Sequence, residues 1–89
     1  MYALPGAELV EEGLRDLARG AETPAACLVS IGAPKLRTLG IAVPEPALSD
    51  PEDRLYALLA REDSDSAHGR YNALIRRLVS FERAKACAR

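Results

Sequence analysis

The residues best suited to chemistry are arginines, and they gather in the last third of the chain. Four of them fall within residues 66–87: Arg70, Arg76, Arg77 and Arg83. A guanidinium group binds carboxylate or phosphate through paired N–H donors. Glu82 is the only acid among residues 67–89 and is available to pair with a base on another helix. We expect these five residues to form an interaction surface for a protein, with nucleic acid as the alternative partner.

A second candidate pair is Arg61 and His68, which are separated by six residues. This spacing resembles the Arg-x(4–6)-His motif of HEPN ribonucleases, and the resemblance implies RNA cleavage at a dimer interface. It covers these two residues alone. A single histidine in a polar loop otherwise serves as a solvated or capping residue, and no second histidine or activated nucleophile accompanies it. RNA cleavage is therefore the third hypothesis, and we predict no catalytic residue.

Two groups of carboxylates have the oxygen ligands that hard cations prefer. One comprises Glu8, Glu11 and Glu12, and the other lies next to His68: Glu62, Asp63 and Asp65. The second group lacks the glycine and the ligand alternation of an EF-hand, and acids on an exposed helix usually interact with water. We therefore predict no metal site. The chain also has no glycine-rich phosphate loop and no Cys/His array, so we expect no cofactor.

The segment PAACLVSIGAPKLRTLG, residues 24–40, has the outline of a helix-turn-helix unit. In such a unit Lys35, Arg37 and Thr38 would have to reach the edges of bases. The second helix is only about two turns long and opens with a proline. We prefer to interpret the segment as two short packing helices. Nucleic-acid binding by this pair, or by the arginine-rich C-terminal helix, remains the alternative function.

The arginines of the last third lie on a predicted helix over residues 66–87. Apolar residues recur there at intervals of three and four and share one face: Tyr71, Leu74, Ile75, Leu78, Val79 and Phe81. We expect this face to supply much of the core. Glu82 interrupts it and should lie at its rim, because an unpaired buried carboxylate costs several kcal/mol.

Four more helices precede it. Residues 7–19 form an amphipathic helix that ends at Gly20, with Asp16 predicted to face water. A short helix over residues 24–31 begins with a Thr23 cap, and a second over residues 35–39 ends at Gly40. Residues 41–49 contain two prolines and should cross the surface as an extended connector. The fourth helix runs to about residue 62 and buries three leucines: Leu55, Leu58 and Leu59.

Composition indicates one domain of 89 residues, with 48% hydrophobic and 28% charged residues. Charge is distributed unevenly, because residues 1–66 carry 12 acids and 6 bases whereas residues 67–89 carry 6 bases and 1 acid. Either the acidic body neutralises its own last helix, or the basic helix meets an acidic partner. The ten arginines and two lysines are typical of a GC-rich bacterial genome.

The chain has no apolar run long enough to span a membrane and no signal peptide at its start. Cys27 and Cys87 suit neither a metal site nor a redox motif, and whether they pair is open. These features predict a cytoplasmic protein with reduced thiols.

We therefore expect an all-α fold, a compact small helical bundle of three main helices and two short ones with a long C-terminal helix, forming a single domain over residues 1–89. The first, fourth and last helices should pack together, and the short pair should cap one end. The leading functional hypothesis is a non-enzymatic interaction module that forms a homo-oligomer or binds another protein.

Overall fold

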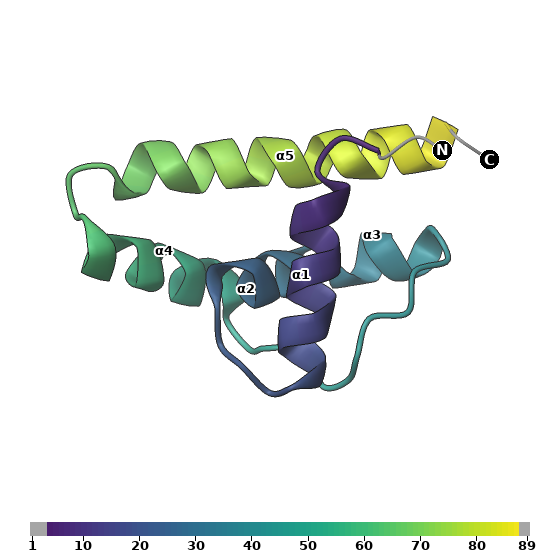
Figure 1. The fold of residues 1–89 in the computed structure, drawn as a ribbon, viewed down its shortest axis with the longest axis horizontal. Helices are drawn as coiled ribbons and strands as arrows, with labels where there is room; N and C mark the ends of the chain where they lie inside the picture. Colours follow the sequence, from purple (N-terminus) through teal and green to yellow (C-terminus); the bar gives the residue numbers. More distant parts are fainter. Residues whose placement is uncertain (1–3, 88–89) are drawn as a thin grey trace.

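The computed structural model describes residues 4–87, and within this range it contains five helices and no strand (Figure 1). The helices are α1 (Ala7–Ala18), α2 (Pro24–Ile31), α3 (Ala33–Thr38), α4 (Pro51–Glu62) and α5 (Ala67–Cys87). The all-α prediction is confirmed, with three longer helices, two short ones and a C-terminal helix of 21 residues.

The helix ends follow the local signals in the sequence. The Thr23 hydroxyl accepts a hydrogen bond from the Ala26 N–H at 3.2 Å and caps α2, whose first residue is Pro24. Gly40 adopts a left-handed conformation with φ of 88° after α3. The Ile41 N–H then donates to the Leu36 carbonyl at 3.0 Å, which is the hydrogen bond expected of a Schellman motif.

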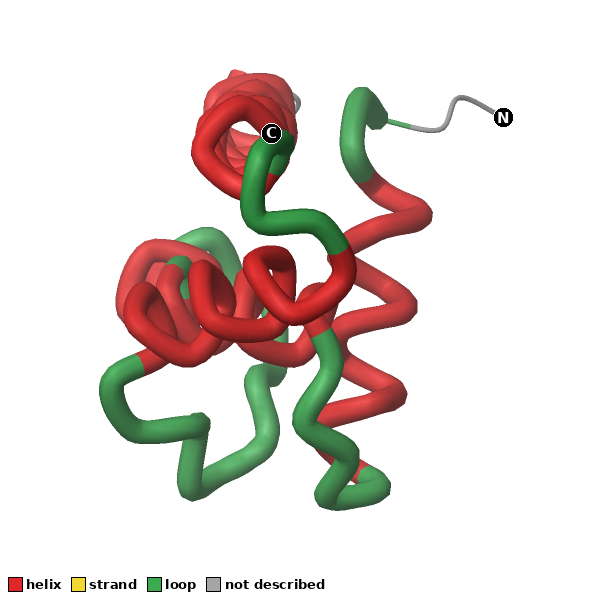
Figure 2. Tube along the Cα trace, turned by 90° about the vertical axis from the view of Figure 1, so that its left-hand side faces the viewer, coloured by secondary structure: helices red, strands yellow, loops and turns green. Residues whose placement is uncertain are grey.

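The centre of the fold is α2, which corrects the expected packing of the first, fourth and last helices around one another. α2 contacts each of the other four helices, and residues 25–30 are all buried. In Figure 2, α5 lies above α2 and α4, while α1 crosses beside them. A short helix takes the central place because almost every one of its side chains is small or apolar, so it can be surrounded on all sides.

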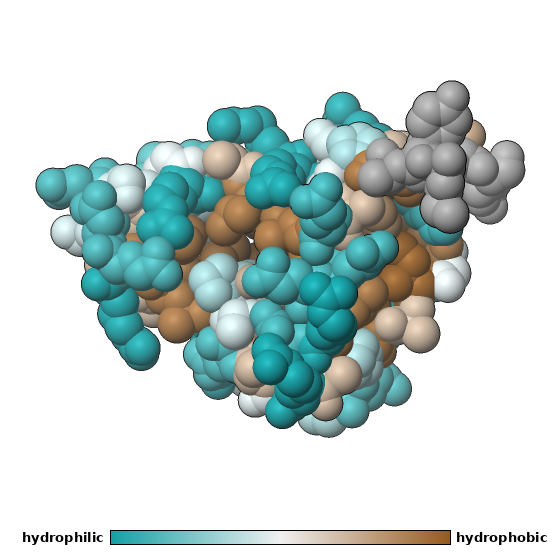
Figure 3. All heavy atoms as spheres, viewed as in Figure 1, coloured by the Kyte–Doolittle hydropathy of each residue, from teal (hydrophilic) through white to brown (hydrophobic). Residues whose placement is uncertain are grey.

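The long helix α5 contributes less to the core than the sequence predicts. Its fully buried residues are Ala67, Leu78 and Phe81, while Leu74 and Ile75 are half-buried. Val79 was expected on the buried face, but 36% of its surface is exposed. Successive residues are rotated by about 100° around a helix. Val79 therefore lies beyond the edge of the face of α5 that packs on α2, which has Leu78 at its centre. On the face shown in Figure 3, apolar side chains remain visible between α5 and the helices below it.

Three further features differ from the prediction. Asp16 is buried and not solvent-facing, because its carboxylate accepts hydrogen bonds from Arg19 and Thr23. The connector over residues 41–49 is attached to the core instead of crossing the surface without a partner. Val43 is buried, and the Leu48 N–H donates to the Ser30 hydroxyl at 3.1 Å. Leu58, expected to be buried with Leu55 and Leu59, is half-buried.

Candidate functional site

The five predicted interaction residues do not form one continuous cluster. Arg70 is engaged within the fold, since its guanidinium lies 2.9 Å from the Glu62 carboxylate at the end of α4. Both side chains are partly exposed, and such a pair contributes at most about 1 kcal/mol. Arg76 and Arg77 line a recess beside α1, Glu82 lies at the rim of the core, and Arg83 follows Val79 along α5.

One flank carries a continuous apolar stripe made of Tyr71, Ile75 and Val79, together with Tyr56 from α4. The three α5 residues are spaced by four positions and therefore follow one another along the helix. The ring of Tyr71 packs against that of Tyr56, with centroids 5.9 Å apart and planes tilted by 55°. Tyr56 is 42% exposed, and it and Val79 are the two large hydrophobic residues that are exposed among residues 4–87. The stripe therefore presents apolar surface that the single chain leaves uncovered.

Charges differ between the two ends of this stripe. Tyr71 lies near Glu52 and Asp53 at the start of α4, while Arg83 and Lys85 follow Val79 along α5. Burial raises the pKa of the Tyr71 hydroxyl, and the negative charges of Glu52 and Asp53 raise this pKa further. The hydroxyl therefore stays protonated and able to donate a hydrogen bond at neutral pH.

Glu82 lies at the rim of the core, as predicted. A Cβ atom placed on Gly32 would lie 3.0 Å from the Glu82 carboxylate and 3.1 Å from Leu78, so this carboxylate covers the junction between α2 and α3. Burial raises the pKa of Glu82, and the positive charge of Lys35 partly opposes that rise. No ion pair of Glu82 within 4.0 Å occurs among the residues that the structure describes.

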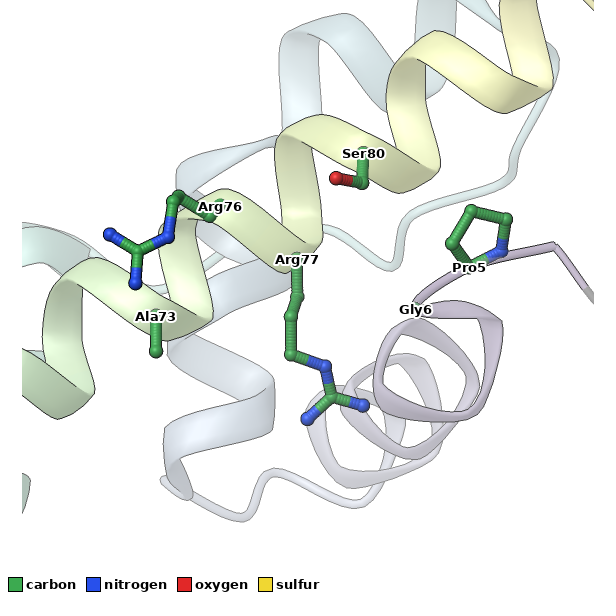
Figure 4. Close-up of a pocket in the computed structure, with 6 residues that line it drawn as sticks. All are labelled: Pro5, Gly6, Ala73, Arg76, Arg77 and Ser80. Atoms are coloured by element: carbon green, nitrogen blue, oxygen red, sulfur yellow. The ribbon is translucent and has the colours of Figure 1, made fainter.

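The opposite flank of α5 borders an open recess of about 500 Å³ next to the start of α1 (Figure 4). Its lining consists of Pro5, Gly6, Ala73, Arg76, Arg77 and Ser80. Arg77 extends from α5 toward α1, and Arg76 lies farther back along α5 (Figure 4). The sequence indicated the arginines but not the recess, because only the close approach of α1 to α5 creates it.

The Arg61 and His68 pair is not joined by a hydrogen bond within residues 4–87. Both side chains are exposed, and His68 Nε2 instead lies 3.2 Å from the amide nitrogen of Asn72. RNA cleavage by this pair stays a prediction.

The residues suggested for reading DNA are largely engaged locally. Arg37 donates to the Val43 carbonyl at 3.3 Å, and the Thr38 hydroxyl donates to the Pro34 carbonyl at 3.0 Å. Gly32 alone separates α2 from α3, and α3 has six residues. This arrangement favours the interpretation of the segment as a pair of packing helices.

Acidic groups and cysteines show no assembled site in the described part of the chain. No group of three or more His, Cys, Asp or Glu residues has the geometry to hold a metal ion there. Both cysteines are free thiols, Cys27 buried and Cys87 exposed, which answers the question of their pairing. Burial raises the pKa of the Cys27 thiol and thus keeps it protonated.

In residues 4–87, no helix combines the length and apolar character needed to cross a bilayer.

Searches with this chain against models of known protein families, curated proteins and solved structures found no match. The function of the chain must therefore be inferred from the apolar stripe and the recess along α5.

Proposed function

We propose that this chain is a non-enzymatic interaction module that forms a homodimer through the stripe of Tyr56, Tyr71, Ile75 and Val79. The observation that carries this proposal is the uncovered apolar surface along that flank of α5, at spacing that suits a second helix. The two free thiols fit a reducing compartment, and we place the protein in the cytoplasm.

An antiparallel pair of α5 helices satisfies the requirements of two-fold symmetry. In such a pair, residue i of one copy meets residue j of the other, and j meets i. If the helices cross at the level of Arg77, Ile75 faces the second copy's Val79, and Tyr71 faces the second copy's Arg83. The first contact buries apolar side chains, and the second places a guanidinium near an aromatic ring, where cation–π attraction stabilises it.

Charge also favours the antiparallel arrangement over the parallel one. The loop before α5 holds Asp63 and Asp65, and the other end of α5 holds Arg83 and Lys85. Antiparallel pairing brings the acidic end of each copy near the basic end of the other, whereas parallel pairing would place like charges together. Complementary potentials steer association and suppress the wrong geometry.

The test measures molar mass by size-exclusion chromatography with light scattering over a range of protein concentrations. Val79→Lys places a charge on the stripe, opposite the second copy's Ile75, and should convert the dimer to a monomer. Ser80→Lys adds the same charge one residue later, about 100° farther around the helix and off the stripe, and should leave the dimer intact. Circular dichroism of both variants checks that the helices are retained.

Two results would overturn this proposal. One is a monomer throughout the micromolar range for the unmodified chain. The other is equal dissociation by both lysine substitutions, which would show that general charge, not the stripe, controls association.

A further inference from the structure

We propose that the recess between α1 and α5 binds the phosphate group of a small phosphorylated molecule. The feature that carries this inference is a pair of arginines in the lining of a hollow whose lining includes no acid. The six lining residues hold two formal positive charges, on Arg76 and Arg77, and no negative charge (Figure 4). Glu8, the acid in the first turn of α1, is not among them.

Arg76 and Arg77 form no ion pair within residues 4–87, a property that they share with Arg15, Arg61 and Arg83, but they also line the recess. Arg19, Arg37, Arg54 and Arg70 each lie within 4.0 Å of a carboxylate. Within residues 4–87, no carboxylate lies within that distance of Arg76 or Arg77. Both side chains are exposed, so an incoming anion need not displace an ion pair. The Arg77 guanidinium turns toward α1, whereas that of Arg76 turns the other way (Figure 4). An arginine can hold a phosphate through two parallel N–H donors.

The start of α1 adds backbone donors on the other side of the recess. Gly6 is the N-cap residue and provides no side chain to accept hydrogen bonds from the first turn. The Ala7 N–H donates to the Leu4 carbonyl and the Val10 N–H to the Gly6 carbonyl, at 3.0 and 3.1 Å. The N–H groups of Glu8 and Leu9 have no partner in the described residues. Free first-turn N–H groups and the helix dipole favour an anion at this position.

Gly6 allows the start of α1 to lie close to α5. Its φ of 78° is left-handed, and a Cβ atom there would lie 2.8 Å from the Arg77 carbonyl oxygen. Glycine therefore lets the start of α1 approach the backbone of α5, so that the Arg77 side chain and the first turn of α1 flank one space. The chain thus sets the arginines of α5 beside Pro5 and Gly6, which directly precede the free N–H groups of the first turn of α1.

The lining chemistry suits an oxyanion such as phosphate and does not suit an aromatic ligand. Ser80 contributes a hydroxyl, which donates to phosphate oxygens as readily as the arginines do. No aromatic side chain lines the recess, so it offers no surface on which a base would stack. A volume of about 500 Å³ suits a small molecule and not a folded partner.

The recess and the proposed dimer stripe share only one edge of α5. At about 100° per residue, Ala73 lies about 160° around the helix from Ile75, whereas Arg76 lies about 60° from Val79. The part of the recess between Ala73 and the start of α1 would therefore stay open in the dimer.

The experiment titrates inorganic phosphate and pyrophosphate into the full chain and follows the backbone amides by two-dimensional NMR. Sodium chloride at matched ionic strength serves as the reference. We expect the largest shifts at Glu8, Leu9 and Ser80, with pyrophosphate binding more tightly than phosphate. Arg77→Gln should weaken binding by about tenfold, a change typical of one lost charged hydrogen-bond partner. Arg61→Gln removes an exposed arginine of α4 that lies outside both the recess and the apolar stripe, and it should change affinity by less than about twofold.

Three outcomes would overturn the inference. The first is no binding of either anion at low-millimolar concentration, and the second is equal weakening by Arg77→Gln and Arg61→Gln, which would indicate a general charge effect. The third is preferential binding of a single-stranded oligonucleotide with a steep salt dependence and a strong contribution from Arg83. That result would assign the basic face to a nucleic-acid backbone instead.

Discussion

The Thr23 hydroxyl donates a hydrogen bond of 2.7 Å to the Asp16 carboxylate and so connects the last turn of α1 to the first turn of α2. The same hydroxyl accepts the N–H of Ala26 as the cap of α2, and the other oxygen of Asp16 pairs with Arg19. Asp16 is only 6% exposed. The corner between the two helices therefore depends on a carboxylate that must stay ionised.

Acid should remove the contribution of Asp16 to stability. The hydrogen bond from Thr23 lowers the pKa of Asp16, and the hydrogen bond and charge of Arg19 lower it further. A carboxyl group whose pKa is lower when folded contributes stability above its unfolded pKa and loses it as pH falls through the folded pKa. Urea unfolding should therefore show Asp16→Asn to be less stable than the parent at neutral pH, with the difference shrinking in acid. A difference that is constant with pH would exclude this role for the ionised carboxylate.

Local signals predicted the helices well because they act over a few residues. The N-cap Thr23 and the left-handed glycines at positions 20 and 40 define helix ends through neighbouring backbone groups. The apolar spacing in the last third correctly predicted a helix to Cys87. These features need no knowledge of the rest of the chain.

The packing could not be predicted in the same way because it depends on contacts between distant residues. Nothing in the pattern of α2 says that four helices surround it. Asp16 has the spacing of a solvent-facing residue, and only Thr23, seven positions later, reveals why it is buried. Val79 fits the apolar repeat of α5 but lies beyond the face that contacts α2, because α2 is much shorter than α5 and covers only part of it.

The candidate site was predictable in its residue types and not in its shape. Charge clustering drew attention to Arg76 and Arg77, whose role as binding residues stays a prediction. The pairing of Arg70 with Glu62 and the recess at Gly6 both arise from tertiary contacts, which periodicity does not report. The α5 residues of the apolar stripe were included in the predicted core face, whereas Tyr56 was not, and the structure leaves Val79 and Tyr56 exposed.

The close approach of α1 to α2 makes Gly13 a sensitive position. A Cβ atom on Gly13 would meet the Ala25 carbonyl oxygen and lie 2.7 Å from Val29 Cγ1, so the helices must separate to accept it. We expect Gly13→Ala to destabilise the fold by about 2 to 4 kcal/mol, measured by urea unfolding. Gly69→Ala is the matched control because its Cβ would meet nothing within 4 Å, and alanine there should stabilise α5 by up to about 1 kcal/mol. Equal effects at the two glycines would contradict the close contact.

The burial of α5 can be mapped by three alanine substitutions. Leu78 is 3% exposed and contacts the end of α2, so Leu78→Ala should cost about 2 to 4 kcal/mol. Val79→Ala and Arg76→Ala should each change the stability of the monomer by less than about 0.5 kcal/mol, because both residues are exposed. Thermal unfolding at a concentration below that of dimer formation separates these effects from association. A large loss at Val79 and a small one at Leu78 would show that the helix is rotated from the position described.

Glu82 should respond to pH in the opposite direction from Asp16. Burial raises the pKa of Glu82 despite the nearby positive charge of Lys35, so the ionised form is the less favourable one in the folded state. A carboxyl group with a raised folded pKa adds stability below its unfolded pKa, and that gain is lost as pH rises through the folded pKa. Glu82→Gln should therefore be more stable than the parent at neutral pH, and this advantage should shrink as the pH is lowered.

Glu12→Gln, on the exposed side of α1, is the control and should shift stability by less than about 0.5 kcal/mol at any pH. Destabilisation by Glu82→Gln at neutral pH would instead mean that attraction to Lys35 outweighs desolvation, and Lys35→Gln should then produce a loss of similar size.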